Sequence, residues 1–70
     1  MLYFVYYHTR KKILRHYICE SPKALWETIN NILDKGYTVT EIDDYTPGHG
    51  RAIYSLGFDL QGEPKLIKCN

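Results

Sequence analysis

The sequence is poor in the features that usually reveal a function. Its 70 residues include two cysteines, too few for a disulfide framework, and no CxxC pair that indicates a structural zinc site. It has no phosphate-binding glycine loop and no nucleophile motif. The apolar run at residues 1–7 is far shorter than the roughly 20 residues that span a bilayer. These absences predict a cytoplasmic protein with reduced thiols that binds no membrane, cofactor or metal.

The length allows one domain, residues 1–70. A chain of this size buries only about 60% of the surface that its unfolded form exposes, so its single core is marginal. With no disulfide framework or metal expected, self-association is the expected source of additional stability.

Charge is unevenly distributed along the chain, although the formal net charge is only +1. Residues 1–19 contain four positive side chains and no acid, whereas residues 20–44 carry a net charge of −4. The positive side chains lie close together, at Arg10, Lys11, Lys12 and Arg15. This asymmetry favours an acidic partner, or head-to-tail contact between copies of the chain.

The first third of the chain has the composition of an antiparallel hairpin. Residues 2–8 and 13–19 are rich in β-branched and aromatic side chains and are separated by a polar stretch. If residues 9–12 form the loop, His8 lies opposite Ile13 and Tyr6 lies opposite Arg15. The first strand is apolar on both faces, which predicts that both faces are covered.

A helix of about 14 residues is predicted between Ser21 and Gly36. Ser21 is a typical N-cap and Pro22 suits the first helical position, while Gly36 supplies a left-handed C-terminal stop. Apolar residues recur at helical spacing and form one buried stripe, namely Leu25, Ile29, Ile32 and Leu33, flanked by Trp26.

The remaining chain has further strand patterns. In residues 37–45 the apolar positions change parity, which predicts either partial burial of both faces or a bulge near Glu41. Alternating apolar residues in 52–60 predict a fourth strand, in which Gly57 indicates a bend or a close contact. Residues 65–69 are a candidate short edge strand guarded by lysines.

These elements predict an α+β fold with two layers, in which one helix packs on one face of an antiparallel sheet of four to five strands in ββαββ order. One helix covers only one face, so we expect a second copy of the chain to cover the other in a homodimer. The residues assigned to that tyrosine-rich interface are Tyr3, Val5, Tyr7 and Tyr17.

The basic hairpin at residues 8–16 has two interpretations. Its four cations suit phosphate contacts with nucleic acid, with neighbouring tyrosines stacking on bases. They are also ordinary solvated side chains at a hairpin tip, or contacts for an acidic protein surface.

A third hypothesis places a small enzyme or ligand site at the turn of residues 45–51. His49 and Arg51 lie there after Asp43 and Asp44, so an acid could orient the imidazole while Arg51 held an anion. The acids at Glu41, Asp43 and Asp44 are otherwise expected to keep their segment soluble or to meet the basic hairpin of a second copy. The leading hypothesis is a non-catalytic, homodimeric macromolecule-binding module with a regulatory role.

Overall fold

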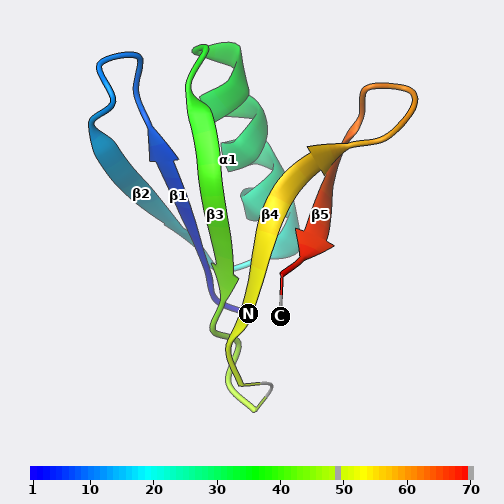
Figure 1. Cartoon of the computed structure of the whole chain (residues 1–70). Helices are drawn as coiled ribbons and strands as arrows, with labels where there is room; N and C mark the ends of the chain where they lie inside the picture. The colour runs from blue at the N-terminus through cyan, green and yellow to red at the C-terminus, as the bar shows by residue number, and fades with distance from the viewer. Residues whose placement is uncertain (49, 70) are drawn as a thin grey trace.

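The computed structural model of the chain describes residues 1–48 and 50–69. It contains one helix and five strands in a single antiparallel sheet, which confirms the predicted α+β fold (Figure 1). The strand order across the sheet is β2-β1-β3-β4-β5. The elements are β1 (Tyr3–His8), β2 (Leu14–Cys19), α1 (Pro22–Asp34), β3 (Thr38–Asp44), β4 (Ala52–Phe58) and β5 (Pro64–Lys68).

The helix begins and ends where its capping residues predict. The Ser21 hydroxyl accepts a hydrogen bond from the Ala24 amide at 3.1 Å, and Pro22 opens the first turn. At the other end Gly36 has a φ of +75°, and the Tyr37 amide donates to the Ile32 carbonyl at 3.2 Å. This pairing closes a Schellman motif, which satisfies carbonyls that the helix leaves free.

The core lies between the helix and one face of the sheet. Helix α1 contacts β1, β2 and β3, and its buried residues are Leu25, Ile29 and Ile32. On the sheet side the core contains Tyr3, Val5, Tyr7, Cys19 and Ile42.

The structure therefore corrects the predicted interface. Tyr3, Val5 and Tyr7 are buried beneath the helix of their own chain, so they are not free to cover a second copy. The other residue of the set, Tyr17, is exposed and stacks on Tyr7 on the helix side. The face that the helix leaves open is instead the one that carries Phe4 and its neighbours.

The register of the first hairpin differs by one residue from the predicted one. His8 pairs with Leu14 and Tyr6 pairs with His16, rather than with Ile13 and Arg15. The cause is a five-residue connection, in which the Thr9 amide donates to the Ile13 carbonyl at 3.1 Å. Because side chains alternate between faces, this shift puts His16 on the open face together with Tyr6.

The predicted change of parity in the third strand is a bulge in β3. Tyr6 pairs with Glu41 but Tyr7 pairs with Val39, so Thr40 is inserted between them. The Thr40 hydroxyl donates to the Tyr6 carbonyl at 3.2 Å. The extra residue places Val39 and Ile42 on the same buried side of the sheet.

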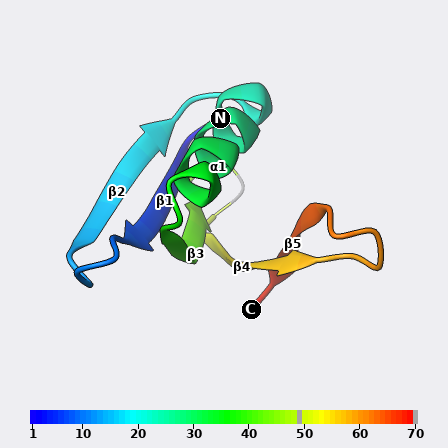
Figure 2. The same ribbon diagram turned by 90° about the horizontal axis from the view of Figure 1, so that it is seen from above.

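The last two strands form a hairpin that leaves the body of the molecule. Pairing between β3 and β4 covers only Ile42–Asp44 with Ala52–Tyr54. Beyond it, the β4–β5 hairpin extends away from α1 (Figure 2). At Gly57, where the sequence indicated a bend or a close backbone contact, the space of a Cβ is taken by the side chain of Ile67. Within the described residues, no helix has the length and apolar character needed to cross a membrane.

Candidate functional site

The basic tip of the β1–β2 hairpin lies beside the C-terminal end of α1. Lys12 takes a left-handed conformation with a φ of 61°, and its amide donates to the Thr9 carbonyl at 2.8 Å. The Arg10 guanidinium approaches Gly36, where a Cβ would come within 2.7 Å of Nη2. A cation at this position is favoured by the partial negative charge of the helix C-terminus.

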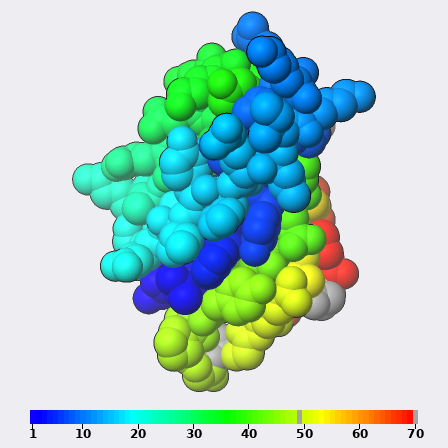
Figure 3. Space-filling view, turned by 90° about the vertical axis from the view of Figure 1, so that its left-hand side faces the viewer, coloured from blue at the N-terminus to red at the C-terminus, as the bar shows by residue number. Residues whose placement is uncertain are grey.

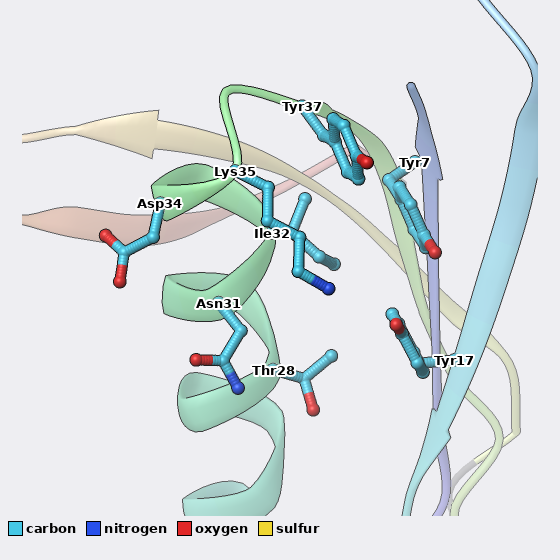
Figure 4. A pocket seen from close by; sticks show the side chains of 8 residues that line it. All are labelled: Tyr7, Tyr17, Thr28, Asn31, Ile32, Asp34, Lys35 and Tyr37. Carbon is cyan, nitrogen blue, oxygen red and sulfur yellow. The ribbon is translucent and has the colours of Figure 1, made fainter. Parts of the chain in front are cut away.

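Two cavities open between this hairpin tip and the helix, and we call them the outer and inner cavities. The outer cavity has a volume of about 690 Å³ and the inner cavity about 380 Å³. They share Tyr7, Lys35 and Tyr37 in their walls. The outer cavity is completed by Thr9, Arg10, Lys11, Ile13 and Arg15. The inner cavity, shown in Figure 4, is completed by Tyr17, Thr28, Asn31, Ile32 and Asp34.

Three stacked tyrosines form the sheet-side wall of the inner cavity (Figure 4). The rings of Tyr17 and Tyr7 have centroids 5.3 Å apart, and those of Tyr7 and Tyr37 are 5.9 Å apart, both with an interplanar angle of 9°. Hydrogen bonding to Tyr17, followed by burial, raises the pKa of the Tyr7 phenol, whereas the nearby Arg15 lowers it. The wall is therefore a neutral aromatic surface with a cation close to it.

The cations of the outer cavity lack carboxylate partners. In the described part of the chain, ion pairs join Lys23 to Glu27 and Arg51 to Asp43, and no other is found. The structure thus gathers three of the four cations of the basic hairpin around one cavity, at Arg10, Lys11 and Arg15, and adds Lys35 from the end of α1. Lys12 does not line the outer cavity. The lining carries four positive side chains and no acid.

The open face of the sheet carries a cluster of aromatic rings. Phe4 lies at the centre, with its ring centroid 6.0 Å from that of His16 and 5.1 Å from that of Tyr45. Tyr6 completes the cluster at 5.8 Å from His16. Two exposed aliphatic side chains, Leu14 and Ile18, continue the apolar surface along β2.

Asp43 also faces this side of the sheet but is almost completely buried, with 1% of its surface exposed. Its Oδ2 accepts hydrogen bonds from Arg51 Nη2 at 2.8 Å and from the Tyr45 hydroxyl at 3.3 Å. Burial opposes ionisation, but the interaction with the Glu41 carboxyl, the hydrogen bonds from Arg51 and Tyr45 and the charge of Arg51 outweigh it and lower the pKa of Asp43. The expectation that Asp43 is a solubilising surface acid is therefore wrong.

The same ion pair removes the support for an anion site at the 45–51 turn. Arg51 is engaged by Asp43, and its guanidinium lies 5.4 Å from the centre of the Tyr45 ring. His49, the other residue predicted for that site, lies outside the described residues. Asp44 accepts a hydrogen bond from the Thr46 amide at 2.8 Å. The two aspartates therefore hold the end of β3 and its turn in place.

The histidines and cysteines of the described residues form no cluster that could hold a metal ion. Cys19 is buried in β2, where its thiol lies 3.4 Å from the Thr28 hydroxyl. Cys69 is exposed and follows β5, at the opposite edge of the sheet. Both thiols are free.

Four residues that line the cavities were not predicted from the sequence as site residues, namely Asn31, Asp34, Lys35 and Tyr37. Their position beside the basic hairpin depends on the strand order, because β3 starts next to the end of β1. The helix stop at Gly36 was a partial indication of this position, because the residues that follow it begin the next strand at the end of the sheet. No family model, curated protein or solved structure matches the chain.

Proposed function

We propose that the protein is a non-catalytic binding module whose first partner is a second copy of itself, joined by pairing of β2 with β2. The observation that carries this proposal is an edge strand that lacks the features which usually prevent pairing with another chain. Strand β2 forms one edge of the sheet, and five of its six residues are exposed. Figure 3 faces this edge, where no other segment covers the strand.

The free backbone groups of β2 follow from the hairpin geometry. The bond between the Thr9 amide and the Ile13 carbonyl makes these two residues a hydrogen-bonded pair. Because such pairs alternate along an antiparallel ladder, the N–H and C=O groups of Arg15 and Tyr17 point to β1. Those of Leu14, His16 and Ile18 point outward. An unpaired row of this kind is a template for another strand.

The outward groups are self-complementary about a two-fold axis. An antiparallel pairing centred on His16 places Leu14 of one copy opposite Ile18 of the other, and His16 opposite His16. All three outward residues then form hydrogen-bonded pairs. The side chains of Leu14 and Ile18, which are 67% and 55% exposed, then meet as cross-strand neighbours on the open face and lose part of their contact with water.

The opposite edge of the sheet is built differently, which argues that β2 is the edge used. Strand β5 begins with Pro64, which has no amide hydrogen, and carries Lys65 and Lys68. Proline and lysine are common means of preventing edge-to-edge pairing. Within β2 the single formal charge is Arg15, on the helix side. Dimerisation through β2 also supplies the stability that a 70-residue core lacks.

Sedimentation equilibrium of the wild type and two lysine variants tests the proposal. The wild type is expected to have twice the 8.3 kDa mass of the chain at micromolar concentration. Ile18→Lys places two like charges beside the paired edge and is expected to give a monomer. Ile67→Lys is the matched control, because Ile67 is also exposed on the open face but belongs to β5.

The control distinguishes edge pairing from stacking of the two open faces. Edge pairing predicts that Ile67→Lys remains a dimer. A wild-type monomer at 100 μM, a dimeric Ile18→Lys variant, or loss of the dimer in both variants would each contradict β2 pairing. Circular dichroism of each variant verifies that the fold is kept.

A further inference from the structure

The outer and inner cavities differ in chemistry although they share a wall. The outer cavity is ringed by Arg10, Lys11, Arg15 and Lys35, with no acid among its lining residues. Unneutralised cations gathered around a cavity attract an anion, and a phosphate group suits the forked donors of arginine. The hairpin tip thus has a ligand-binding geometry that an isolated row of surface lysines lacks.

The inner cavity suits a planar group. Its aromatic wall of Tyr7, Tyr17 and Tyr37 faces the last turns of α1 (Figure 4). Asn31 and Thr28 line it from the helix side and provide hydrogen-bonding groups. An apolar wall with a few polar groups opposite is the usual composition of a small-molecule site.

The charges set the orientation of a ligand that occupies both cavities. In the inner cavity Asp34 offsets the shared Lys35, whereas the outer cavity carries four cations and no acid and so attracts an anion more strongly. An anionic group therefore belongs in the outer cavity and an uncharged ring in the inner one. Each cavity volume lies within the range of about 300–1,000 Å³ that is common for ligand sites.

We propose that the two cavities together bind a nucleotide, with its phosphate among Arg10, Lys11 and Arg15 and its base beside the tyrosine wall. The ligand is either a free nucleoside phosphate or the phosphorylated end of a nucleic-acid strand, which share this chemistry. This site rests on the cavities of one chain and does not depend on the β2 dimer.

Isothermal titration calorimetry with the full chain tests the proposal. The probes are the four ribonucleoside 5′-monophosphates, the corresponding nucleosides and inorganic phosphate. At least one monophosphate is expected to bind about tenfold or more tightly than both phosphate and its own nucleoside, because it occupies both cavities. Phosphate binding as tightly as every nucleotide would overturn the role of the inner cavity, and no binding of any probe at 5 mM would overturn the site.

Two adjacent lysines provide a matched pair of variants for the outer cavity. Lys11→Glu and Lys12→Glu change the net charge equally, but only Lys11 lines the cavity. Reversing a charge next to the phosphate is expected to weaken nucleotide binding about tenfold. Lys12→Glu is expected to change it less than about twofold at physiological salt, where solvent screens the more distant charge. Equal losses in the two variants would show general electrostatic attraction and overturn the cavity assignment.

Two adjacent asparagines provide the corresponding pair for the inner cavity. Asn31→Ala removes a lining amide, whereas Asn30→Ala changes an exposed residue of the same helix outside the lining. Asn31→Ala is expected to weaken nucleotide binding about three- to tenfold, as for one lost hydrogen bond, and to leave phosphate binding unchanged. Equal nucleotide affinity in both variants would contradict the placement of the base.

The source of the nucleotide is decided by an eight-residue oligothymidylate with and without a 5′-phosphate. Tighter binding of the phosphorylated strand than of free monophosphate identifies a strand end as the ligand. Preference for the free monophosphate identifies a small molecule. Equal binding of the two strands would exclude a strand end as the ligand. Amide NMR spectra of every variant confirm that the fold is intact.

Discussion

Replacing Asp43 by asparagine tests whether the buried carboxylate on the open face stabilises the fold. The substitution keeps the shape of the side chain and one acceptor oxygen, but it removes the negative charge. Oδ2 of Asp43 accepts hydrogen bonds from Arg51 at 2.8 Å and from Tyr45 at 3.3 Å. In the asparagine variant this acceptor is a neutral amide oxygen. The other carboxylate oxygen, Oδ1, has no hydrogen-bond partner within the described residues. Replacing Oδ1 by the amide nitrogen of asparagine therefore breaks no hydrogen bond.

The expected loss follows from these contacts. A hydrogen bond to a charged group contributes about 1.5–3 kcal/mol and a neutral one about 0.5–1.5 kcal/mol. Arg51 is 52% exposed and stays hydrated after the exchange, which places the loss of unfolding free energy at the lower end, near 1 kcal/mol. Urea unfolding followed by the fluorescence of Trp26 measures this loss at a fixed protein concentration. A midpoint shift of about 1 M is expected for a small domain.

The effect depends on pH in a direction that the pKa shift fixes. The folded pKa of Asp43 lies below the ordinary value of 3.8, so the ionised form is favoured by folding. Its contribution is complete above pH 3.8 and is lost as the pH falls through the folded value. The difference between Asp43→Asn and wild type should therefore be largest near pH 7 and shrink progressively below pH 3.8.

Glu41 provides a contrast only two residues away. Its interaction with the neighbouring carboxylate of Asp43, together with burial, raises the pKa of Glu41 above the ordinary 4.5. Folding thus disfavours its ionised form, and Glu41→Gln should increase stability at pH 7, with the gain lost once the pH falls below 4.5. An Asp43→Asn variant as stable as wild type at pH 7, or a destabilised Glu41→Gln variant, would refute this reasoning.

Four further substitutions test the fold by the same urea assay. Gly36→Ala and Gly62→Ala should each cost about 1–2 kcal/mol because φ is +75° and +81° at these positions; an unchanged midpoint in either variant would contradict the left-handed conformation. Ser21→Ala should cost about 1 kcal/mol by removing the N-cap, and an unchanged midpoint would contradict the cap. Ile29→Val should cost about 0.5–1.5 kcal/mol, and a smaller loss would contradict full burial of Ile29.

The helix and the strands were predictable because their signals are local. Ser21, Pro22 and Gly36 act within one turn of chain, and the apolar stripe from Leu25 onward repeats at helical spacing. The change of parity in β3 left two alternatives, one of which was a bulge near Glu41, and the structure has the bulge at the neighbouring Thr40. Each of these features depends on residues that are close together in the sequence, so the sequence alone is enough to predict them.

The register and the faces were not predictable in the same way. Strand β1 is apolar on both sides, so its sequence does not say which side the helix covers. The five-residue hairpin connection depends on Lys12 taking a left-handed conformation, for which no glycine gave a signal. The burial of Asp43 depends on Arg51, eight residues along the chain, returning beside it. The cavities likewise need the helix end and the hairpin tip to meet.

Hydrogen exchange at three amides tests the central proposal, pairing of β2 with β2, most directly. The N–H groups of Leu14, His16 and Ile18 point away from β1 and exchange freely in a monomer. Paired edges are expected to slow their exchange at high protein concentration, with protection falling on dilution, while the amides of Arg15 and Tyr17 remain protected throughout. Fast exchange of the three outward amides at the highest concentration, in a protein whose Arg15 and Tyr17 amides are protected, would contradict the account.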